Sequence, residues 1–340
     1  MKWYILSLLT LMTVLGTVFL TACATLPPTQ ETPPSPPPIT EGKPPEEVKP
    51  EPEEIPRFPL TIVDDLDRTV KIERLPQRIV SLAPSSTEIL FALGLEDKLV
   101  GTTDYCDYPA AAKAKPRVAG YLTPDMEKVV SLEPDLVLAE SIHKEMVLPA
   151  LEKLGLTVVV MSAETIDTVI KDIALIGQIN GKSRAASQLI NNLTSRIETI
   201  TTKTKDLSAA QRPRVLYVCW HDPIWTMGRK TFINDLIWKA GGINIFANDF
   251  EKSRVVSLEA VVAKNPQVII VSGMGTSGNL IYISIIKETR LAGIDAVANK
   301  MVYKISDANL IERPGPRIVD GLEEVAKFIH PEIFGAASEK

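Results

Sequence analysis

The chain has 340 residues, of which 37 are lysine or arginine and 42 are aspartate or glutamate, and its net charge is −5. This mildly acidic balance, without basic runs, argues against nucleic-acid binding. Only three cysteines are present, and no cysteine–histidine spacing is typical of a zinc site.

Residues 1–22 have the pattern of a secretory signal peptide. Lys2 precedes an apolar run from Ile5 to Leu20, which ends in Leu-Thr-Ala before Cys23. This ending resembles the bacterial lipobox, in which the cysteine is lipidated and becomes the new N-terminus. A plain transmembrane helix is the alternative, although the run is barely long enough to span a bilayer. We therefore expect an extracytoplasmic protein, in the periplasm or on the outer face of the cell, anchored in the membrane through Cys23.

The next segment, residues 23–57, is predicted to be a tether. Twelve of its residues are proline, with Glu, Thr and Lys between them. This composition cannot bury a core and favours extended polyproline II. The composition becomes globular near residue 58, and the remaining length suits two lobes. The expected parts are an N-terminal α/β lobe over 58–163, connecting helices over 164–210 and a C-terminal α/β lobe over 211–335.

Short apolar runs alternate with helical patterns in the first lobe. A strand and turn are expected over 60–65, and further strands over 70–72, 78–82, 99–103, 136–139 and 157–161. One helix is expected to begin at Pro84, and another at Thr123-Pro124, where a capping hydroxyl precedes proline. Alternation of strands and helices predicts a parallel sheet.

Two helices are predicted in the middle of the globular region, over 166–180 and 183–206. The second carries apolar residues on one face and would extend for about 36 Å, which suits a stiff connection between lobes. An ordinary covering helix is the alternative.

The second lobe begins with an apolar strand, and a polar and aromatic loop follows it. Further on, a glycine-rich loop precedes another helix. The expected elements are strand 214–220, loop 221–228, helix 232–239, strand 268–271, loop 273–278, a helix near 280–291, strand 301–304 and a closing helix from 317 to 328.

One pattern occurs twice, once in each predicted lobe. Glu127-Lys128-Val129-Val130 precedes Pro134 and an apolar run, and Glu259-Ala260-Val261-Val262 precedes Pro266 and another run, 132 positions later. Each copy predicts a short helix that ends before a proline and a buried strand. Acids in a first helical turn complement the helix dipole. Their matched positions favour a second role, in which Glu127 and Glu259 dock into basic sockets of a symmetric partner.

Aromatic residues gather in loops expected at the carboxyl ends of strands, where α/β sheets bind ligands. Tyr105 and Tyr108 lie in loop 104–109, Trp220 and Trp225 lie in 220–228, and Tyr121 precedes the second helix. Flat rings suit a large planar ligand. Trp220 ends a strand and is the better candidate for the core, whereas Trp225 is the better ligand candidate.

Other polar residues give weaker signals. Arg313 and Arg317 could bind ligand oxygens, although a surface salt bridge is at least as good an interpretation of Arg317. His143 and His221 are possible metal ligands, but loop histidines are more often solvated. The loop 273–278 fits G-x-G-x-x-G, which leaves a secreted nucleotide-dependent enzyme as an alternative. Cys106 and Cys219 fall in different lobes, so we expect unpaired thiols rather than a disulfide.

The chain resembles a known family in three segments. Arg78 to Leu90, Glu127 to Ala139 and Ala240 to Phe246 are similar to the single-helix-hinge class of ABC-importer substrate-binding proteins, and most of all to its cobalamin-binding members. The similarity covers about residues 58–330. It implies two Rossmann-like α/β lobes with parallel sheets, joined by one long helix, with ligand held between them and no enzymatic step or cofactor.

The resemblance also implies roles for particular residues. Pro84, Tyr105, Trp225 and Arg313 match cobalamin-contacting positions, and Glu127 and Glu259 match acids that dock onto a dimeric permease, which works with an ATPase. Tyr121 stands where the compared member has tryptophan, and Ser253 lies near another tryptophan position. Haem and ferric-siderophore binders share the fold, so such a ligand is the alternative to cobalamin, with Tyr105, Tyr121 or His143 near the iron.

Overall fold

A computed structural model describes residues 55–273 and 277–336. The predicted signal peptide, Cys23 and nearly all of the predicted tether lie outside the described residues. Among the helices that the structure describes, none combines the length and the apolar character needed to cross a membrane.

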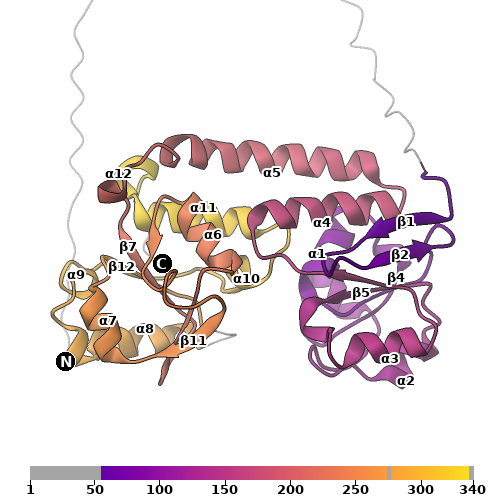
Figure 1. Ribbon diagram of the computed structural model, residues 1–340, viewed down its shortest axis with the longest axis horizontal. Coiled ribbons are helices and arrows are strands. Elements are labelled where there is room, and N and C mark those ends of the chain that lie inside the picture. The colour runs from indigo at the N-terminus through magenta and orange to yellow at the C-terminus, as the bar shows by residue number, and fades with distance from the viewer. Residues whose placement is uncertain (1–54, 274–276, 337–340) are drawn as a thin grey trace, which may run out of the picture. The chain divides into compact units, whose positions relative to one another are not determined.

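The first lobe is built around a four-stranded parallel sheet with the order β4-β3-β5-β6 (Figure 1). Its strands are short and almost entirely buried, as expected of parallel strands covered on both faces. An antiparallel hairpin of β1 and β2 packs beside it. The elements are β1 (Leu60–Val63), β2 (Thr69–Ile72), β3 (Ile79–Ser81), α1 (Pro84–Ala92), β4 (Leu99–Thr102), α2 (Met126–Ser131), β5 (Leu136–Glu140), α3 (Val147–Lys153) and β6 (Val158–Met161).

The second lobe repeats this plan with the parallel order β10-β7-β12-β13. In both lobes the first strand of the parallel sheet, β3 or β7, has the strand of the repeated pattern on one side of it and a partner closer in sequence, β4 or β10, on the other. The elements are β7 (Arg214–Val218), β8 (Trp220–His221), β9 (Ile224–Met227), α6 (Phe232–Lys239), β10 (Ile243–Asn244), β11 (Ser253–Val256), α7 (Leu258–Lys264), β12 (Val268–Val271), α8 (Gly278–Lys287), α9 (Asp295–Ala298), β13 (Val302–Lys304), α10 (Asn309–Glu312), α11 (Ile318–Ile329) and α12 (Pro331–Phe334).

Two helices connect the lobes, α4 (Ile166–Ile179) and the longer α5 (Ser183–Thr204) (Figure 1). A Cβ atom at Gly177 would lie 2.4 Å from the Ala186 Cβ, so the glycine allows close packing of the two helices. Arg196 of α5 forms ion pairs with Asp320 and Glu323 of α11. One apolar cluster runs from the first sheet through α4 and α5 to α6 and α11. The predicted connecting helix is therefore present, and it packs on α4 and on α6 and α11 of the second lobe.

The repeated sequence pattern folds into the same local structure in both lobes. The helix that carries it is capped by Asp125 in the first copy and by Ser257 in the second, each of which accepts a backbone N–H bond from the third residue after it. Each helix is followed by a residue with positive φ, 44° at Glu133 and 43° at Asn265, before the proline and the buried strand.

An arginine at the start of each central strand completes the match between the two copies. Arg78 donates hydrogen bonds to the carbonyl of Glu133, and Arg214 donates to that of Asn265. The repeat therefore extends beyond the residues that revealed it, to the way in which each helix is held against its sheet.

Two expectations from the sequence were wrong. The second helix of the first lobe does not begin at Thr123-Pro124, because Asp125 is its cap and Pro124 lies in a bridge to Ala119. Residues 221–228 are not a loop. They fold into the hairpin of β8 and β9, and β9 pairs with β11 to form a separate antiparallel sheet. Along β9, buried Ile224 and Thr226 alternate with more exposed residues, as expected of a strand with one covered face.

Candidate functional site

A cavity of about 530 Å³ lies between the two lobes, at the carboxyl ends of β5, β6 and β7. Ligands of open α/β sheets bind at this edge. Two of the predicted ligand residues, Tyr121 and Trp225, line it. From the N-terminal half the lining comprises Tyr121, Glu140, Ser141, Met161, Ser162, Ala163 and Glu164, and from the second lobe Tyr217, Cys219, Trp225, Met227, Lys230, Thr231, Phe232, Ile233, Lys252, Ser253, Ile311, Glu312 and Pro314.

Glu140, the last residue of β5, supplies an acidic group on the first-lobe side. Its carboxylate accepts hydrogen bonds from the Tyr121 hydroxyl and, at 2.5 Å, from Ser85 Oγ. Burial and the neighbouring Glu140 raise the pKa of Tyr121 far above its usual range, so this phenol stays protonated. His143 supports the pair, because its Nδ1 accepts from the Glu140 N–H at 3.0 Å and its Nε2 lies 2.7 Å from the Tyr121 carbonyl oxygen.

Glu312 is the counterpart on the second-lobe side. Its Oε1 accepts hydrogen bonds from Ser272 Oγ at 2.6 Å and from the Tyr217 hydroxyl at 3.4 Å. Burial raises the pKa of Glu312 above the ordinary value for glutamate. Burial, together with Glu312, also raises the pKa of Tyr217. Each lobe therefore presents to the cavity one carboxyl group that is held by a tyrosine and a serine.

The two lysines of the lining are paired with carboxylates. Lys252 forms an ion pair with Glu164, which joins the second lobe to the segment after β6, and Lys230 forms one with Glu251 at 3.0 Å. Since their charges are balanced locally, Glu140 and Glu312 give the inner cavity an acceptor-rich, acidic character.

Aromatic rings extend from the cavity to the surface. Trp225 on β9 is 41% exposed and lines the cavity, and Trp220, its partner in the register on β8, is 37% exposed. The prediction that Trp220 belongs to the core is wrong, because β8 is an edge strand of the small antiparallel sheet. Tyr105 is 60% exposed, and its ring meets that of Tyr121 edge to face at 6.4 Å.

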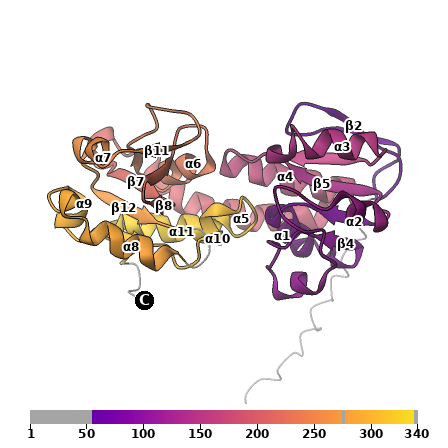
Figure 2. The same cartoon turned by 90° about the horizontal axis from the view of Figure 1, so that it is seen from below.

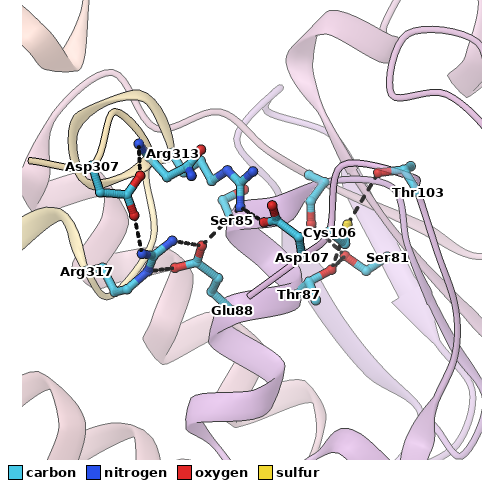
Figure 3. Close-up of polar contacts among 12 residues, drawn as sticks. Ser81, Ser85, Thr87, Glu88, Thr103, Cys106, Asp107, Asp307, Arg313 and Arg317 are labelled. Carbon is cyan, nitrogen blue, oxygen red and sulfur yellow. Dashed lines mark hydrogen bonds and ion pairs between the residues drawn. The ribbon is translucent and has the colours of Figure 1, made fainter. Parts of the chain in front are cut away.

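Ion pairs join the two lobes near the cavity (Figure 3). Arg317 donates to both carboxylate oxygens of Glu88, at 2.9 and 2.7 Å, and Arg313 donates to Asp107 at 2.6 Å. The Glu88 side chain, on α1, is only 2% exposed, and the Arg317 guanidinium also lies 3.7 Å over the Tyr108 ring. The salt bridge expected for Arg317 is thus buried between the lobes rather than exposed. We call this group the cross-lobe ion pairs.

The other three predicted ligand residues, Pro84, Tyr105 and Arg313, lie outside the cavity lining. Pro84 is the first residue of α1 and is half-buried, and Arg313 is held by Asp107. Pro314, the neighbour of Arg313, lines the cavity instead. Ligand contact by all five of the predicted residues stays a prediction.

The two acids predicted to dock are both exposed, in the first turn of α2 and of α7. Their helices are capped by other residues, so neither carboxylate is needed for capping. Within the described part of the chain, neither Glu127 nor Glu259 forms an ion pair within 4 Å. Helices α2 and α7 lie on the same side of the fold, away from α5 (Figure 1, Figure 2).

The remaining candidates have structural environments. Within residues 55–273 and 277–336, no group of three or more His, Cys, Asp or Glu side chains could hold a metal ion. His143 is completely buried. Cys106 and Cys219 are buried and unpaired, which confirms the expected free thiols, and burial raises the pKa of Cys219 to about 12. Part of the 273–278 loop lies outside the described residues.

Glu140, Glu312 and Tyr217 were not identified from the sequence. Glu140 comes at the end of a buried strand, so its position at a sheet edge was a usable signal. Glu312 stands next to Arg313, and its position gives no such signal. Tyr217 lies within an apolar strand, and nothing in its neighbours indicates that its hydroxyl reaches a carboxylate.

Comparisons with known proteins agree with this geometry. A family model described as periplasmic binding protein matches residues 79–308. The chain is 35% identical over 282 residues to the uncharacterized ABC transporter substrate-binding lipoprotein YvrC of Bacillus subtilis, which covers 82% of this chain and 87% of that protein. It is 31% identical over 254 residues to the vitamin B12-binding protein of Vibrio cholerae, covering 74% and 89%.

Solved structures show the same fold. The periplasmic vitamin B12 binding protein BtuF of Vibrio cholerae superposes with a TM-score of 0.66 at 29% identity, covering 75% of this chain and 97% of that one. A periplasmic heme binding protein from Pseudomonas aeruginosa also gives 0.66, at 26% identity, covering 76% and 94%. This chain therefore belongs to the periplasmic binding protein family and is an ABC-importer substrate-binding protein, not an enzyme.

Proposed function

We propose that this protein is a lipid-anchored receptor that captures a corrinoid, with cobalamin as the best candidate, and delivers it to an ABC permease. The observation that carries the choice of ligand is the pair of carboxyl groups, Glu140 and Glu312, in one cavity. A corrinoid is a planar ring rimmed by neutral amides, whose N–H groups donate hydrogen bonds. Carboxyl oxygens already positioned by tyrosine and serine are suitable acceptors for them.

The same cavity disfavours the alternative ligands, haem and ferric siderophores. Haem carries two anionic propionates, and the described lining of the cavity offers them no free cation, because both of its lysines are already paired with carboxylates. Coordination of iron by Tyr121 requires a phenolate, but its hydroxyl is bound to Glu140 and its pKa is raised. Relatives and structural neighbours include both cobalamin and haem binders, so they do not choose between the two ligands. The choice of the corrinoid rests on the chemistry of the cavity.

The aromatic surface suits a ligand that is larger than the inner cavity. A corrinoid with its nucleotide arm exceeds the enclosed volume, so part of it has to rest at the mouth. Trp225, Tyr105 and Trp220 provide exposed rings there. Contact of a flat macrocycle with such rings buries a large area at little cost in side-chain entropy.

The ligand proposal is tested with purified protein and three probes. Titration with cyanocobalamin, haemin and a ferric hydroxamate, followed by visible absorption and calorimetry, is expected to show binding tighter than micromolar for cyanocobalamin alone. Tight binding of haemin or of the siderophore without cyanocobalamin binding would reject the corrinoid. A double variant, Glu140→Gln with Glu312→Gln, keeps hydrogen-bond acceptors but removes the negative charges, and should relax the discrimination against haemin.

Delivery is assigned to Glu127 and Glu259, which we propose bind cationic side chains of a dimeric permease that works with an ATPase. Glu127→Lys with Glu259→Lys is expected to leave cyanocobalamin affinity unchanged and to abolish uptake by cells. If affinity falls and uptake persists, the assignment is wrong.

The membrane anchor is assigned to Cys23, which would be acylated and, on removal of residues 1–22, become the new N-terminus. Cys23→Ser is expected to abolish incorporation of labelled palmitate and to leave an uncleaved precursor that keeps residues 1–22. Unchanged incorporation of palmitate by this variant would exclude lipidation at this position.

A further inference from the structure

The two docking helices share an exposed apolar residue that the proposed docking role does not use. In α2, Val129 is completely buried and Val130 is 41% exposed. In α7, Val261 is completely buried and Val262 is also 41% exposed. The fourth and fifth residues of each helix therefore point, respectively, into the lobe and out of it.

Each exposed valine lies on the same helix face as the docking acid. Val130 follows Glu127 by three positions, and Val262 follows Glu259 by three, which places the two side chains of each pair side by side on the helix surface. The buried valine, the left-handed residue after the helix and the proline fix the rotation of both helices in the same way. Each lobe thus presents one carboxylate with one apolar side chain beside it.

A single exposed valine is ordinary on a protein surface. The match between the two lobes is not ordinary. In both, a valine stands three positions after the acid, follows a buried valine directly and has the same exposed fraction. The neighbouring position lacks this match, since Lys128 of α2 pairs with Asp125 at 3.6 Å whereas α7 has Ala260. The matched features are therefore confined to the acid, the valines and the groups that fix the helix.

We propose that Val130 and Val262 are the apolar halves of two equivalent docking sites, and that the partner offers each lobe a cationic side chain with an apolar one next to it. This inference rests on the proposed delivery to a permease. A partner made of two identical subunits fits it, because two equal sites on one chain need two equal receptors. The apolar contact would exclude water from the ion pair, and an ion pair at a dry centre contributes more than one on a wet rim.

The test uses the full-length lipoprotein and its permease–ATPase complex in proteoliposomes, with cyanocobalamin as cargo. Replacement of both valines, Val130→Asn with Val262→Asn, is expected to weaken docking roughly tenfold, and each single replacement about threefold. Cyanocobalamin affinity of the free protein should not change, because neither valine lines the cavity. Val130→Ile with Val262→Ile preserves the apolar character and should dock as the unaltered protein does.

Two controls make the outcomes distinct. Val63→Asn changes a valine that is 61% exposed on β1, outside both docking helices, and should have no effect on docking. Glu127→Gln with Glu259→Gln tests the acids alone. If the glutamate variant fails to dock while the double asparagine variant docks normally, the valine proposal is overturned and the delivery proposal stands. If the glutamate variant also docks normally, both are overturned. Far-ultraviolet circular dichroism of every variant checks the fold.

Discussion

The two lobes share a plan but contribute different chemistry to the cleft. Both have a four-stranded parallel sheet with the same strand order, and both hold the repeated helix, proline and strand in the same way. The first lobe adds the two-stranded hairpin β1-β2, whereas the second adds the three-stranded antiparallel sheet β11-β9-β8, which carries Trp225 to the cavity. The shared frame positions Glu140 and the helices α2 and α7, whereas Glu312 on α10 and the aromatic surface of the added three-stranded sheet belong to the second lobe alone.

The lobes also differ in the charges they bring to their common border. The first lobe supplies the carboxylates Glu88 and Asp107, and the second supplies the guanidinium groups Arg313 and Arg317. Opposite charges on the two sides hold the lobes in one arrangement, in addition to α5.

The largest effect is expected from breaking the cross-lobe ion pairs. Arg317→Ala leaves the carboxylate of Glu88, whose side chain is 2% exposed, without its bidentate partner and should lower the free energy of unfolding by about 3 kcal/mol. Urea unfolding followed by tryptophan fluorescence measures it. The double variant Glu88→Gln with Arg317→Gln should lose less free energy of unfolding than the two single variants Glu88→Gln and Arg317→Gln lose together. Additive losses would show that the two side chains do not depend on one another.

A second effect is a dependence of stability on pH, which arises at the connecting helix α4. Asp172 on α4 is 2% exposed, and burial, followed by the nearby Asp65 and Glu140, raises its pKa to about 9. The folded state therefore keeps a proton that the unfolded chain loses near its ordinary pKa of about 4, so stability should fall as pH rises between these values. The slope should approach, without exceeding, about 1.4 kcal/mol per pH unit.

The variant that tests this slope is Asp172→Asn, which cannot ionise. Its free energy of unfolding should decline less between pH 5 and 8 than that of the unaltered protein, and the difference between the two should grow with pH. Equal slopes in urea unfolding at the two pH values would show that Asp172 does not carry the pH dependence.

The smallest effect is expected from the two tryptophans of the β11-β9-β8 sheet. Trp225→Ala should weaken cyanocobalamin binding about tenfold, since a lining ring is lost, while Trp220→Ala, which is nearly as exposed but outside the lining, should change it less than threefold. Calorimetric titration measures both. A larger loss for Trp220 than for Trp225 would mean that the ligand rests on the outer edge of the sheet.

The sequence predicted the parts of the fold that follow from periodicity and local chain breaks. Both parallel sheets and the connecting helix were anticipated, and the family comparisons agree with the α/β class. The hairpin at Trp220 to Met227 was missed because its strands are very short and its turn contains Asp222-Pro223, which reads as a loop. Local patterns carry no information about such pairing across a turn.

The candidate site was predicted less completely than the fold. Trp225 and Tyr121 were expected beside a ligand and line the cavity, because aromatic residues after strands are a visible signal. Glu140 and Glu312 were not expected, since their importance arises from tyrosine and serine partners that are distant in sequence, such as Ser85. Arg313 was assigned to the ligand, but in this structure an acid of the other lobe holds it.

The apolar cluster that continues from the first sheet through α4 and α5 to α11 has a consequence for how the protein melts. Neither lobe can be removed without exposing apolar side chains of the connecting helices to water. Heating should therefore give one cooperative transition in calorimetry rather than two, and a fragment that ends after the first sheet should not form a stable domain by itself.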